Sequence, residues 1–200
     1  MKVLVLDAMG VIYSVGDDVR DLLCPFMMEK GVTKDIVETE RLYDLASLGK
    51  MSASEFFKAI DLDPTLEDEY LQRYTLTDGL IDFLKAINSR GFQVWCLSND
   101  LSRWSRKLRT RFGLEKYFSG FVISGDVGFR KPDRAIFEYL VGQLDVSPDN
   151  AVFVDDQPKN LDTAVELGFK TVLFAPAGHN LTGGRHQVVA TFNELLLLLS

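Results

Sequence analysis

The stretch Val3-Leu4-Val5-Leu6-Asp7-Ala8-Met9-Gly10-Val11 opens the chain with four apolar residues that run directly into an aspartate. A second apolar run, Ala151-Val152-Phe153-Val154, ends in the pair Asp155-Asp156. In an open parallel sheet, ligands bind in the crevice beyond the carboxyl ends of the strands. Two short strands that each end in aspartate therefore predict a group of carboxylates at one edge of a parallel sheet.

The rest of the chain alternates between strand-like and helical patterns. Short β-rich runs predict strands at Lys2–Leu6, Gln93–Leu97, Gly120–Ile123, Ala151–Val154 and Lys170–Phe174. Apolar residues at helical spacing predict helices at Gly79–Ser89, Arg134–Leu144 and Asn160–Leu167, and a closing helix that opens near Thr191. This alternation indicates an α/β fold with a Rossmann-like, doubly wound parallel sheet.

Residues 16–77 interrupt this alternation, because they contain helical patterns and no convincing strand. The predicted helices are Val19–Lys30, Lys34–Leu48, Ser52–Ile60 and Leu66–Tyr74. Ser52 and Glu55 have the spacing of a capping box at the start of the third helix. We therefore expect a small all-helical cap, residues 16–77, inserted after the first strand of a core formed by residues 1–15 and 78–200.

Composition narrows the functional classes. The 200 residues carry a formal net charge of −7, which argues against a general nucleic-acid binder. The densest apolar run, residues 195–199, is too short to span a bilayer, and residues 1–2 lead straight into a strand without a signal peptide. The two cysteines, Cys24 and Cys96, suggest no disulfide framework. A soluble, cytoplasmic protein without membrane or nucleic-acid partners is expected.

Four separated motifs occur in an order that resembles the haloacid dehalogenase (HAD) superfamily, in particular its phosphatase-rich branch with a helical cap. Each motif lies at a predicted strand end or in the loop that follows it. They are Val5-Leu6-Asp7-Ala8-Met9-Gly10-Val11, Cys96-Leu97-Ser98-Asn99-Asp100, Gly128-Phe129-Arg130-Lys131-Pro132-Asp133 and Phe153-Val154-Asp155-Asp156-Gln157-Pro158-Lys159-Asn160. The resemblance covers nearly the whole chain and implies a hydrolase that acts on a small phosphorylated substrate.

Asp7 is the candidate nucleophile, because a carboxylate at a strand tip can attack phosphorus and form an aspartyl-phosphate. The resemblance implies that Mg²⁺ is bound by Asp7, by the backbone carbonyl of Met9 and by Asp156. Oxygen ligands of this kind suit a hard divalent cation. Asp155 would orient Lys131 or the waters of the metal.

Substrate phosphate would be bound by residues from two other motifs. Ser98 offers a hydroxyl and Asn99 a backbone N–H at the start of a helix predicted to begin near Leu101, and helix N-termini favour phosphate. By the resemblance, Lys131 neutralises the phosphate and the nucleophile, and Asn160 has a supporting role. Taken alone, each of these motifs is also ordinary capping or turn chemistry.

Met9 departs from the pattern of the family. Most phosphatases of this type carry an aspartate two residues after the nucleophile, which protonates the leaving group and later deprotonates water. A thioether does not titrate, so the loss of this acid/base is expected to cost on the order of 10²–10⁴ in rate for a poor leaving group. Metal binding can persist, since this position contributes only its backbone carbonyl.

Three precedents in the superfamily frame the consequence. Haloacid dehalogenases lack the second acid and use no metal, but they carry small polar residues where this chain has Asp155-Asp156. Phosphonate hydrolases use a lysine of the cap as a Schiff base, for which this chain offers Lys30, Lys34, Lys50 and Lys58. Some sugar-phosphate phosphatases have a small residue at the Met9 position, and residues 48–57 resemble their cap. A catalytically silent protein that binds a phosphorylated ligand is a further alternative.

Two other segments have simpler interpretations. Arg103 to Arg111 contains several basic residues and is expected to be the exposed face of a helix rather than a nucleic-acid patch. His179 and His186 flank a glycine-containing loop expected to lie beyond the last strand, where it could contact substrate.

Overall fold

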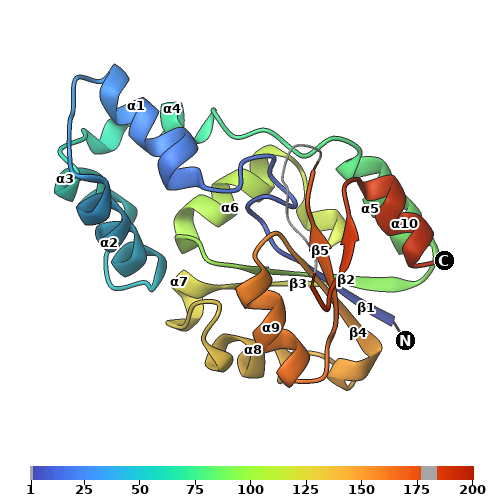
Figure 1. Ribbon diagram of the computed structural model, residues 1–200. Coiled ribbons are helices and arrows are strands. Elements are labelled where there is room, and N and C mark those ends of the chain that lie inside the picture. The colour runs from blue at the N-terminus through green and yellow to red at the C-terminus, as the bar shows by residue number, and fades with distance from the viewer. Residues whose placement is uncertain (1, 177–183) are drawn as a thin grey trace.

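The protein is described by a computed structural model that places residues 2–176 and 184–200. Within these residues, six parallel strands form one sheet in the order β3-β2-β1-β4-β5-β6 (Figure 1). The strands are β1 (Lys2–Leu6), β2 (Phe92–Ser98), β3 (Gly120–Ile123), β4 (Ala151–Asp155), β5 (Lys170–Phe174) and β6 (Gln187–Val189). The predicted doubly wound α/β fold is confirmed.

Helices cover both faces of the sheet (Figure 1). One face packs against α5 (Leu80–Ser89), α6 (Ser102–Arg111) and α10 (Phe192–Leu198), and the other against α8 (Arg134–Val141) and α9 (Pro158–Glu166). Along β1, Leu4 and Leu6 join the first hydrophobic cluster, whereas Val3 and Val5 join the second. Because alternate side chains of a strand point to opposite faces, a fully buried strand is apolar throughout, as residues 3–6 are.

The predicted helical insertion after β1 is also confirmed. It contains η1 (Val19–Leu23), α1 (Cys24–Glu29), α2 (Ile36–Ser47), α3 (Ala53–Ala59), η2 (Pro64–Leu66) and α4 (Glu67–Leu71). The capping box is present, since Ser52 accepts from the Glu55 backbone N–H and Glu55 accepts from the Ser52 backbone N–H. The two connections to the core lie side by side, with the Ser14 N–H bonded to the Thr75 carbonyl at 3.0 Å.

Some element boundaries differ from the predicted ones. Helix α9 begins at Pro158 rather than at Asn160, because proline suits the first helical position, where its missing N–H has no helical partner. Helix α8 ends at Val141, before the weak helix former Gly142. The interpretation of Lys170–Phe174 as the last strand was wrong, since β6 follows it and pairs in parallel with β5. Short elements also occur at η3 (Glu115–Tyr117), α7 (Ser124–Val127) and η4 (Pro148–Asn150).

A core helix, α6, completes the hydrophobic interior of the cap. The Trp104 ring lies fully buried, with ring centroids 5.0–6.3 Å from four aromatic residues of the cap: Tyr43, Phe56, Phe57 and Tyr70. Its indole N–H donates to Glu67 Oε1 at 3.0 Å. These aromatic contacts and this hydrogen bond join the cap and α6 in one packed hydrophobic interior.

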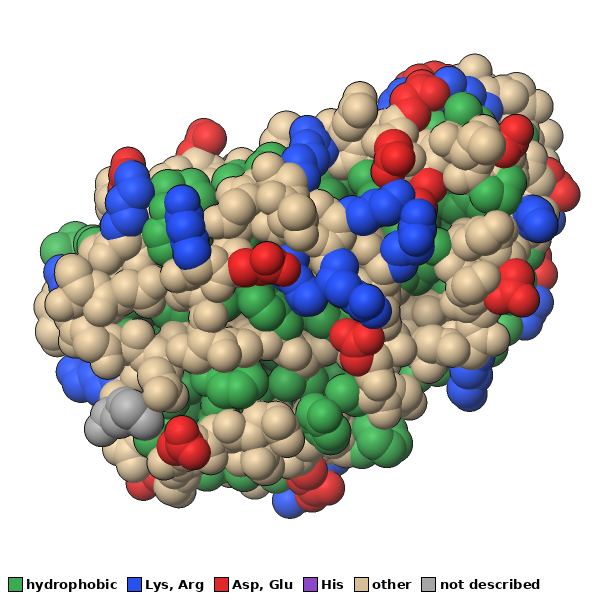
Figure 2. Space-filling model, turned by 180° about the vertical axis from the view of Figure 1, so that it is seen from behind, with side chains coloured by type: hydrophobic (Ala, Val, Ile, Leu, Met, Phe, Trp, Pro, Cys, Tyr) green, Lys and Arg blue, Asp and Glu red, His purple; other side chains and the backbone are tan. Residues whose placement is uncertain are grey.

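Arg103, Arg106 and Arg111 of α6 are exposed, as expected, and basic residues of this helix also contact the cap. Arg103 Nε and Lys107 Nζ both contact the nearly buried Glu67 carboxylate of the cap, at 2.9 and 2.5 Å. Arg111 donates to the carbonyl of Leu71 in α4 at 2.6 Å. Figure 2 shows lysine and arginine side chains gathered between the larger core and the smaller helical lobe. These charges attach the cap to the core.

No helix in residues 2–176 or 184–200 is long and apolar enough to cross a membrane. Both cysteines are free thiols. His179 lies outside the described residues. His186 is buried, and its ring nitrogens contact the Thr171 hydroxyl at 2.8 Å and the Asp162 carboxylate at 3.2 Å. His186 therefore has a structural environment within the core.

Candidate active site

The register of the central strands brings the predicted carboxylates together. Leu6 of β1 pairs with Val154 of β4, and the Asp7 N–H continues this ladder by donating to the Val154 carbonyl at 2.9 Å. Asp7 and Asp155 therefore leave adjacent strands at the same level. Oxygen atoms of Asp7, Asp155 and Asp156 all lie within 4.8 Å of one another.

Lys131 lies between two of these carboxylates. Its ammonium is 2.6 Å from Asp7 Oδ1 and 2.7 Å from Asp155 Oδ2, and its side chain is almost completely buried. Burial alone would lower the pKa of Lys131, but the carboxylates of Asp155 and Asp7 outweigh burial and raise it. The lysine is thus held as a cation directly beside the candidate nucleophile.

One buried cation does not balance three carboxylates. Burial and the nearby negative charge of Asp155 raise the pKa of Asp7 well above its usual range, although Lys131 opposes this shift. Burial and Asp155 also raise the pKa of Asp156, to about 6. Like charges that crowd a low-dielectric site produce this effect. A further cation at this point would stabilise all three ionised groups.

The residues present fit a hard divalent cation. Their donors are carboxylate oxygens, and the Met9 carbonyl accepts no backbone hydrogen bond within the described residues. Gly10, at φ +73°, passes so close to Asp156 that an added Cβ would lie 2.5 Å from Asp156 Oδ2, and Gly16 approaches the same oxygen. The backbone therefore wraps around the exposed side of Asp156.

The remaining predicted residues surround this group. The Asn99 side chain exchanges two hydrogen bonds with the Lys131 backbone, at 2.8 and 2.9 Å, and so fixes the lysine loop. Asn160 Nδ2 donates to both oxygens of Asp155 at 3.0 Å. The Ser98 hydroxyl is buried and has no hydrogen-bond partner in the described part of the chain. A buried hydroxyl without a partner is costly and suits a ligand oxygen.

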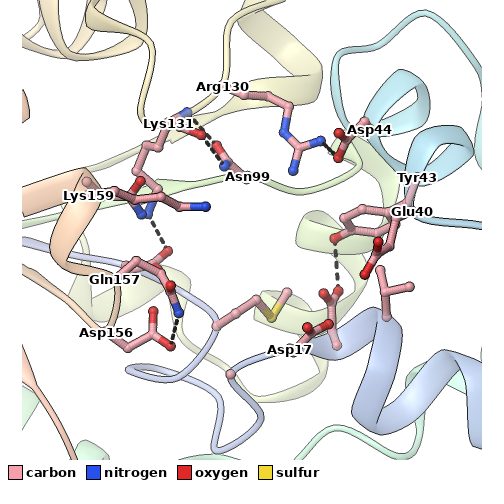
Figure 3. Close-up of a pocket in the computed structure, with 16 residues that line it drawn as sticks. Asp17, Glu40, Tyr43, Asp44, Asn99, Arg130, Lys131, Asp156, Gln157 and Lys159 are labelled. Atoms are coloured by element: carbon pink, nitrogen blue, oxygen red, sulfur yellow. Dashed lines mark hydrogen bonds and ion pairs between the residues drawn. The ribbon is translucent and has the colours of Figure 1, made fainter. Parts of the chain in front are cut away.

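A pocket of about 360 Å³ opens above these residues (Figure 3). Asp7, Met9, Asn99, Lys131, Asp156 and Asn160 line its floor, and cap residues Asp17, Asp18, Glu40, Tyr43 and Asp44 line the opposite wall. None of the four cap lysines that could form a Schiff base lines this pocket. Lys30 is paired with Glu69 and Lys34 with Asp61. This arrangement argues against the chemistry of the phosphonate hydrolases.

Sequence reasoning missed the wall formed by the cap. Asp18 is buried, and its Oδ2 accepts hydrogen bonds from the hydroxyls of Tyr43 at 2.9 Å and Tyr74 at 3.0 Å. Arg130 forms an ion pair with Asp44 across the pocket (Figure 3). The pairing of Asp17-Asp18 after a glycine, with polar residues on one face of the next long helix, was the available signal.

Replacement of Asp18 by asparagine is expected to stabilise the protein at neutral pH. Burial raises the pKa of Asp18, and the two tyrosine hydrogen bonds only partly offset this. A raised folded-state pKa means that the folded protein holds the proton more tightly than the unfolded chain does. The stability from this group is therefore complete below the unfolded pKa, about 3.9, and is lost as the pH rises through the folded pKa.

Asparagine keeps an acceptor for both tyrosines without the charge. The free energy of unfolding is measured with urea at pH 4 and pH 7.5. The difference between Asp18→Asn and the wild type should shift in favour of the variant as the pH rises. Asp17→Asn, at the exposed neighbouring position, is the control. A variant that loses stability relative to wild type between pH 4 and 7.5 would show that the Asp18 charge is stabilising.

The fold and the site together define a class: a doubly wound α/β protein with a carboxylate-rich crevice under a helical cap. A family model described as haloacid dehalogenase-like hydrolase matches residues 1–168. The chain therefore belongs to the haloacid dehalogenase-like hydrolases, as its motifs indicated, and is an enzyme of that family.

Individual relatives agree with this assignment. The chain is 25% identical over 198 residues to glyceraldehyde 3-phosphate phosphatase of Methanopyrus kandleri, with 86% of this chain and 83% of that protein covered. It spans only 42% of flavin mononucleotide hydrolase 1 of Arabidopsis thaliana, to which it is 30% identical over 104 residues, or 52% of its own length.

Solved structures show the same fold. A HAD phosphatase from Thermococcus onnurineus superimposes with a TM-score of 0.77 at 23% identity, covering 100% of this chain and 98% of that one. A HAD family enzyme from Bacteroides thetaiotaomicron, solved with magnesium and inorganic phosphate, gives a TM-score of 0.76 at 21% identity, covering 93% and 100%.

Proposed function

We propose that this protein is a Mg²⁺-dependent phosphatase of small phosphorylated metabolites that works through an aspartyl-phosphate on Asp7. The observation that carries the proposal is the Asp7–Lys131–Asp155 arrangement beside Asp156, at the floor of the pocket. Phosphatase relatives and a structural neighbour with magnesium and phosphate support it. We retain residues 16–77 as the cap that shapes the pocket.

In this proposal the chain's own residues divide the work. A carboxylate oxygen of Asp7 attacks phosphorus, a P–O bond forms, and the bond to the leaving-group oxygen breaks. The Lys131 ammonium neutralises charge on the phosphoryl oxygens. The Ser98 hydroxyl and the Asn99 backbone N–H donate hydrogen bonds to them. Water then attacks phosphorus, the P–O bond to Asp7 breaks, and inorganic phosphate leaves with the protons of the water, which restores the Asp7 carboxylate.

Asp7, Asp156 and the Met9 carbonyl would hold Mg²⁺, with Asp155 fixing Lys131 rather than binding the metal directly. When bound, the ion supplies positive charge that brings two anions, the nucleophile and the phosphate, together. Asn160 holds Asp155 in place through both of its oxygens. Removal of the metal by a chelator should therefore abolish turnover.

Met9 fixes which substrates react well. Its thioether lies at the floor of the pocket and cannot give a proton to a departing oxygen. Aryl and acyl phosphates, whose leaving groups depart without a proton, are expected to react on the order of 10² to 10⁴ times faster than alkyl phosphates of similar size. The test is a panel of such phosphates and of haloacids, with Mg²⁺ and with EDTA.

Three outcomes of this panel would contradict the proposal. Metal-independent release of halide would indicate a dehalogenase. Equal rates for alkyl and aryl phosphates would show that another group supplies the proton. No hydrolysis of any phosphate ester would indicate a protein that only binds phosphorylated ligands.

Restoration of the acid is expected to raise activity toward alkyl phosphates. Met9→Asp places a carboxylate two residues after the nucleophile, and its kcat for alkyl phosphates should rise at least about tenfold while aryl phosphates gain less. Met9→Leu, which changes shape but adds no acid, should leave the ratio unchanged. An equal or lower alkyl rate in a folded Met9→Asp variant would mean that the missing acid is not what limits turnover.

A further inference from the structure

The charged side chains of the cap wall already have partners. Glu40 pairs with Arg20 at 2.6 Å, Asp17 contacts the same arginine at 3.4 Å, and Arg130 holds Asp44. Asp18 is bonded to Tyr43 and Tyr74. Each carboxylate opposite the catalytic floor therefore has a partner within the protein, although Asp17 and Glu40 share one arginine.

Lys159 is different. It lines the pocket and is exposed, and in residues 2–176 and 184–200 no hydrogen bond or ion pair engages its ammonium. Figure 3 shows its side chain extending from the floor side of the pocket toward Tyr43 and Glu40 on the opposite wall. Among the pocket cations of the described chain, Lys131 is held by Asp7 and Asp155 and Arg130 by Asp44, so Lys159 is the cation left for a ligand.

The local structure explains why Lys159 stands there. Pro158 starts α9, and the neighbouring Asn160 turns inward to Asp155, which leaves Lys159 at the rim of the pocket. A cation in the first turn of a helix is unfavourable because the helix dipole is positive at that end. A lysine at this position therefore does not stabilise the helix. Its side chain lies across the pocket from the cap and does not contact the carboxylates of the floor.

We infer that Lys159 determines specificity by binding a second anionic group of the substrate, a carboxylate or a second phosphate, beyond the phosphoryl group that reacts at Asp7. This inference rests on the proposed phosphatase function. It specifies in addition that the part of the substrate beyond the reacting phosphoryl group is negatively charged. The pocket volume of about 360 Å³ restricts that remainder to a small molecule. Lys159 takes no part in the chemical step, which belongs to Lys131 and the carboxylates.

A partly exposed ion pair contributes modestly to binding. A charge-assisted contact at the rim is expected to change kcat/KM on the order of tenfold, through KM rather than kcat, because it is made equally in the ground state and the transition state. This split distinguishes a specificity residue from a structural or catalytic one.

The experiment compares three phosphates of similar size that differ mainly in the charge at the far end of a short alkyl group: phosphoglycolate, ethyl phosphate and phosphoethanolamine. Fructose 1,6-bisphosphate against fructose 6-phosphate tests a second phosphate. The wild type should prefer each additional anion and discriminate against the ammonium. Lys159→Met should lose most of the preference, Lys159→Glu should reverse it, and Lys159→Arg should keep it. Lys58→Met, at an exposed lysine outside the pocket, is the matched control.

A binding measurement keeps the inference testable if turnover is slow. Asp7→Asn with Mg²⁺ should bind 3-phosphonopropionate more tightly than propylphosphonate by calorimetry, and Asp7→Asn/Lys159→Met should bind both equally. If ethyl phosphate is hydrolysed but a second charge on the substrate has no effect, Lys159 does not determine specificity. The same conclusion follows if Lys159→Met keeps the preference for the additional anion. If no phosphate ester is hydrolysed and neither phosphonate binds, the proposed function itself fails, and the inference with it.

Discussion

Replacement of Asp7 by asparagine is expected to lower kcat/KM for an aryl phosphate by at least about 10³-fold, because an amide oxygen cannot form the covalent intermediate. The same change should not destabilise the protein. An asparagine oxygen can still accept from the Ala8 N–H and from Lys131, which contact Asp7 Oδ1 at 2.6 Å each. It also removes one of three crowded negative charges.

The combined result separates chemistry from folding. Steady-state rates and a urea unfolding curve at pH 7.5 should show lost activity with an equal or higher free energy of unfolding. Burial and Asp155 raise the pKa of Asp7, so its ionised form at neutral pH opposes folding. Retained activity in Asp7→Asn would exclude this residue as the nucleophile. If activity and stability were both lost, the loss of activity would be explained more simply by a role of Asp7 in folding.

Trp104→Ala is expected to lower the free energy of unfolding by about 3–5 kcal/mol. The fully buried indole packs against Phe56, Phe57 and Tyr70, and its truncation is expected to leave a cavity. The change also removes the N–H donor of Glu67. Denaturant unfolding followed by circular dichroism measures the loss.

Trp104→Phe is the matched control, because it keeps an aromatic ring in the same place and removes the indole N–H. Its cost should be smaller, about 1–3 kcal/mol, as for the loss of a buried hydrogen bond with partial loss of volume. If Trp104→Ala cost less than about 1 kcal/mol, the cap would not depend on α6 for its interior. The attachment of cap to core described above would then be wrong.

The sheet could be predicted because its strands carry strong signals. Residues 3–6 and 151–154 are continuous apolar runs, and such runs mark strands buried on both faces. Their terminal aspartates predicted the crevice, and the register places Asp7 beside Asp155. In contrast, β6 has three residues, and its apolar pair Val188-Val189 is too short to mark a strand, so its pairing with β5 depends on tertiary contacts that periodicity does not encode.

The pocket wall was much harder to predict. Tyr43 and Asp18 are 25 positions apart, and Trp104 meets the cap from α6, which lies far along the chain. A run of basic residues on α6 is indistinguishable in sequence from an exposed face, because its partner Glu67 lies about forty positions away. Lys159 belongs to the motif of residues 153–160. Its direction into the pocket depends on the start of α9, which Pro158 sets, and the motif alone does not predict it.

Detection of the phosphorylated enzyme tests the central claim most directly. With phenyl phosphate and Mg²⁺, rapid acid quench and peptide mass spectrometry should find a phosphoryl group on the peptide that contains Asp7. The adduct should accumulate in the wild type and fall in Met9→Asp, since Met9 cannot activate the water that removes it. A wild type that turns over phenyl phosphate without any phosphoryl group on Asp7, or that carries the group elsewhere, would contradict the account.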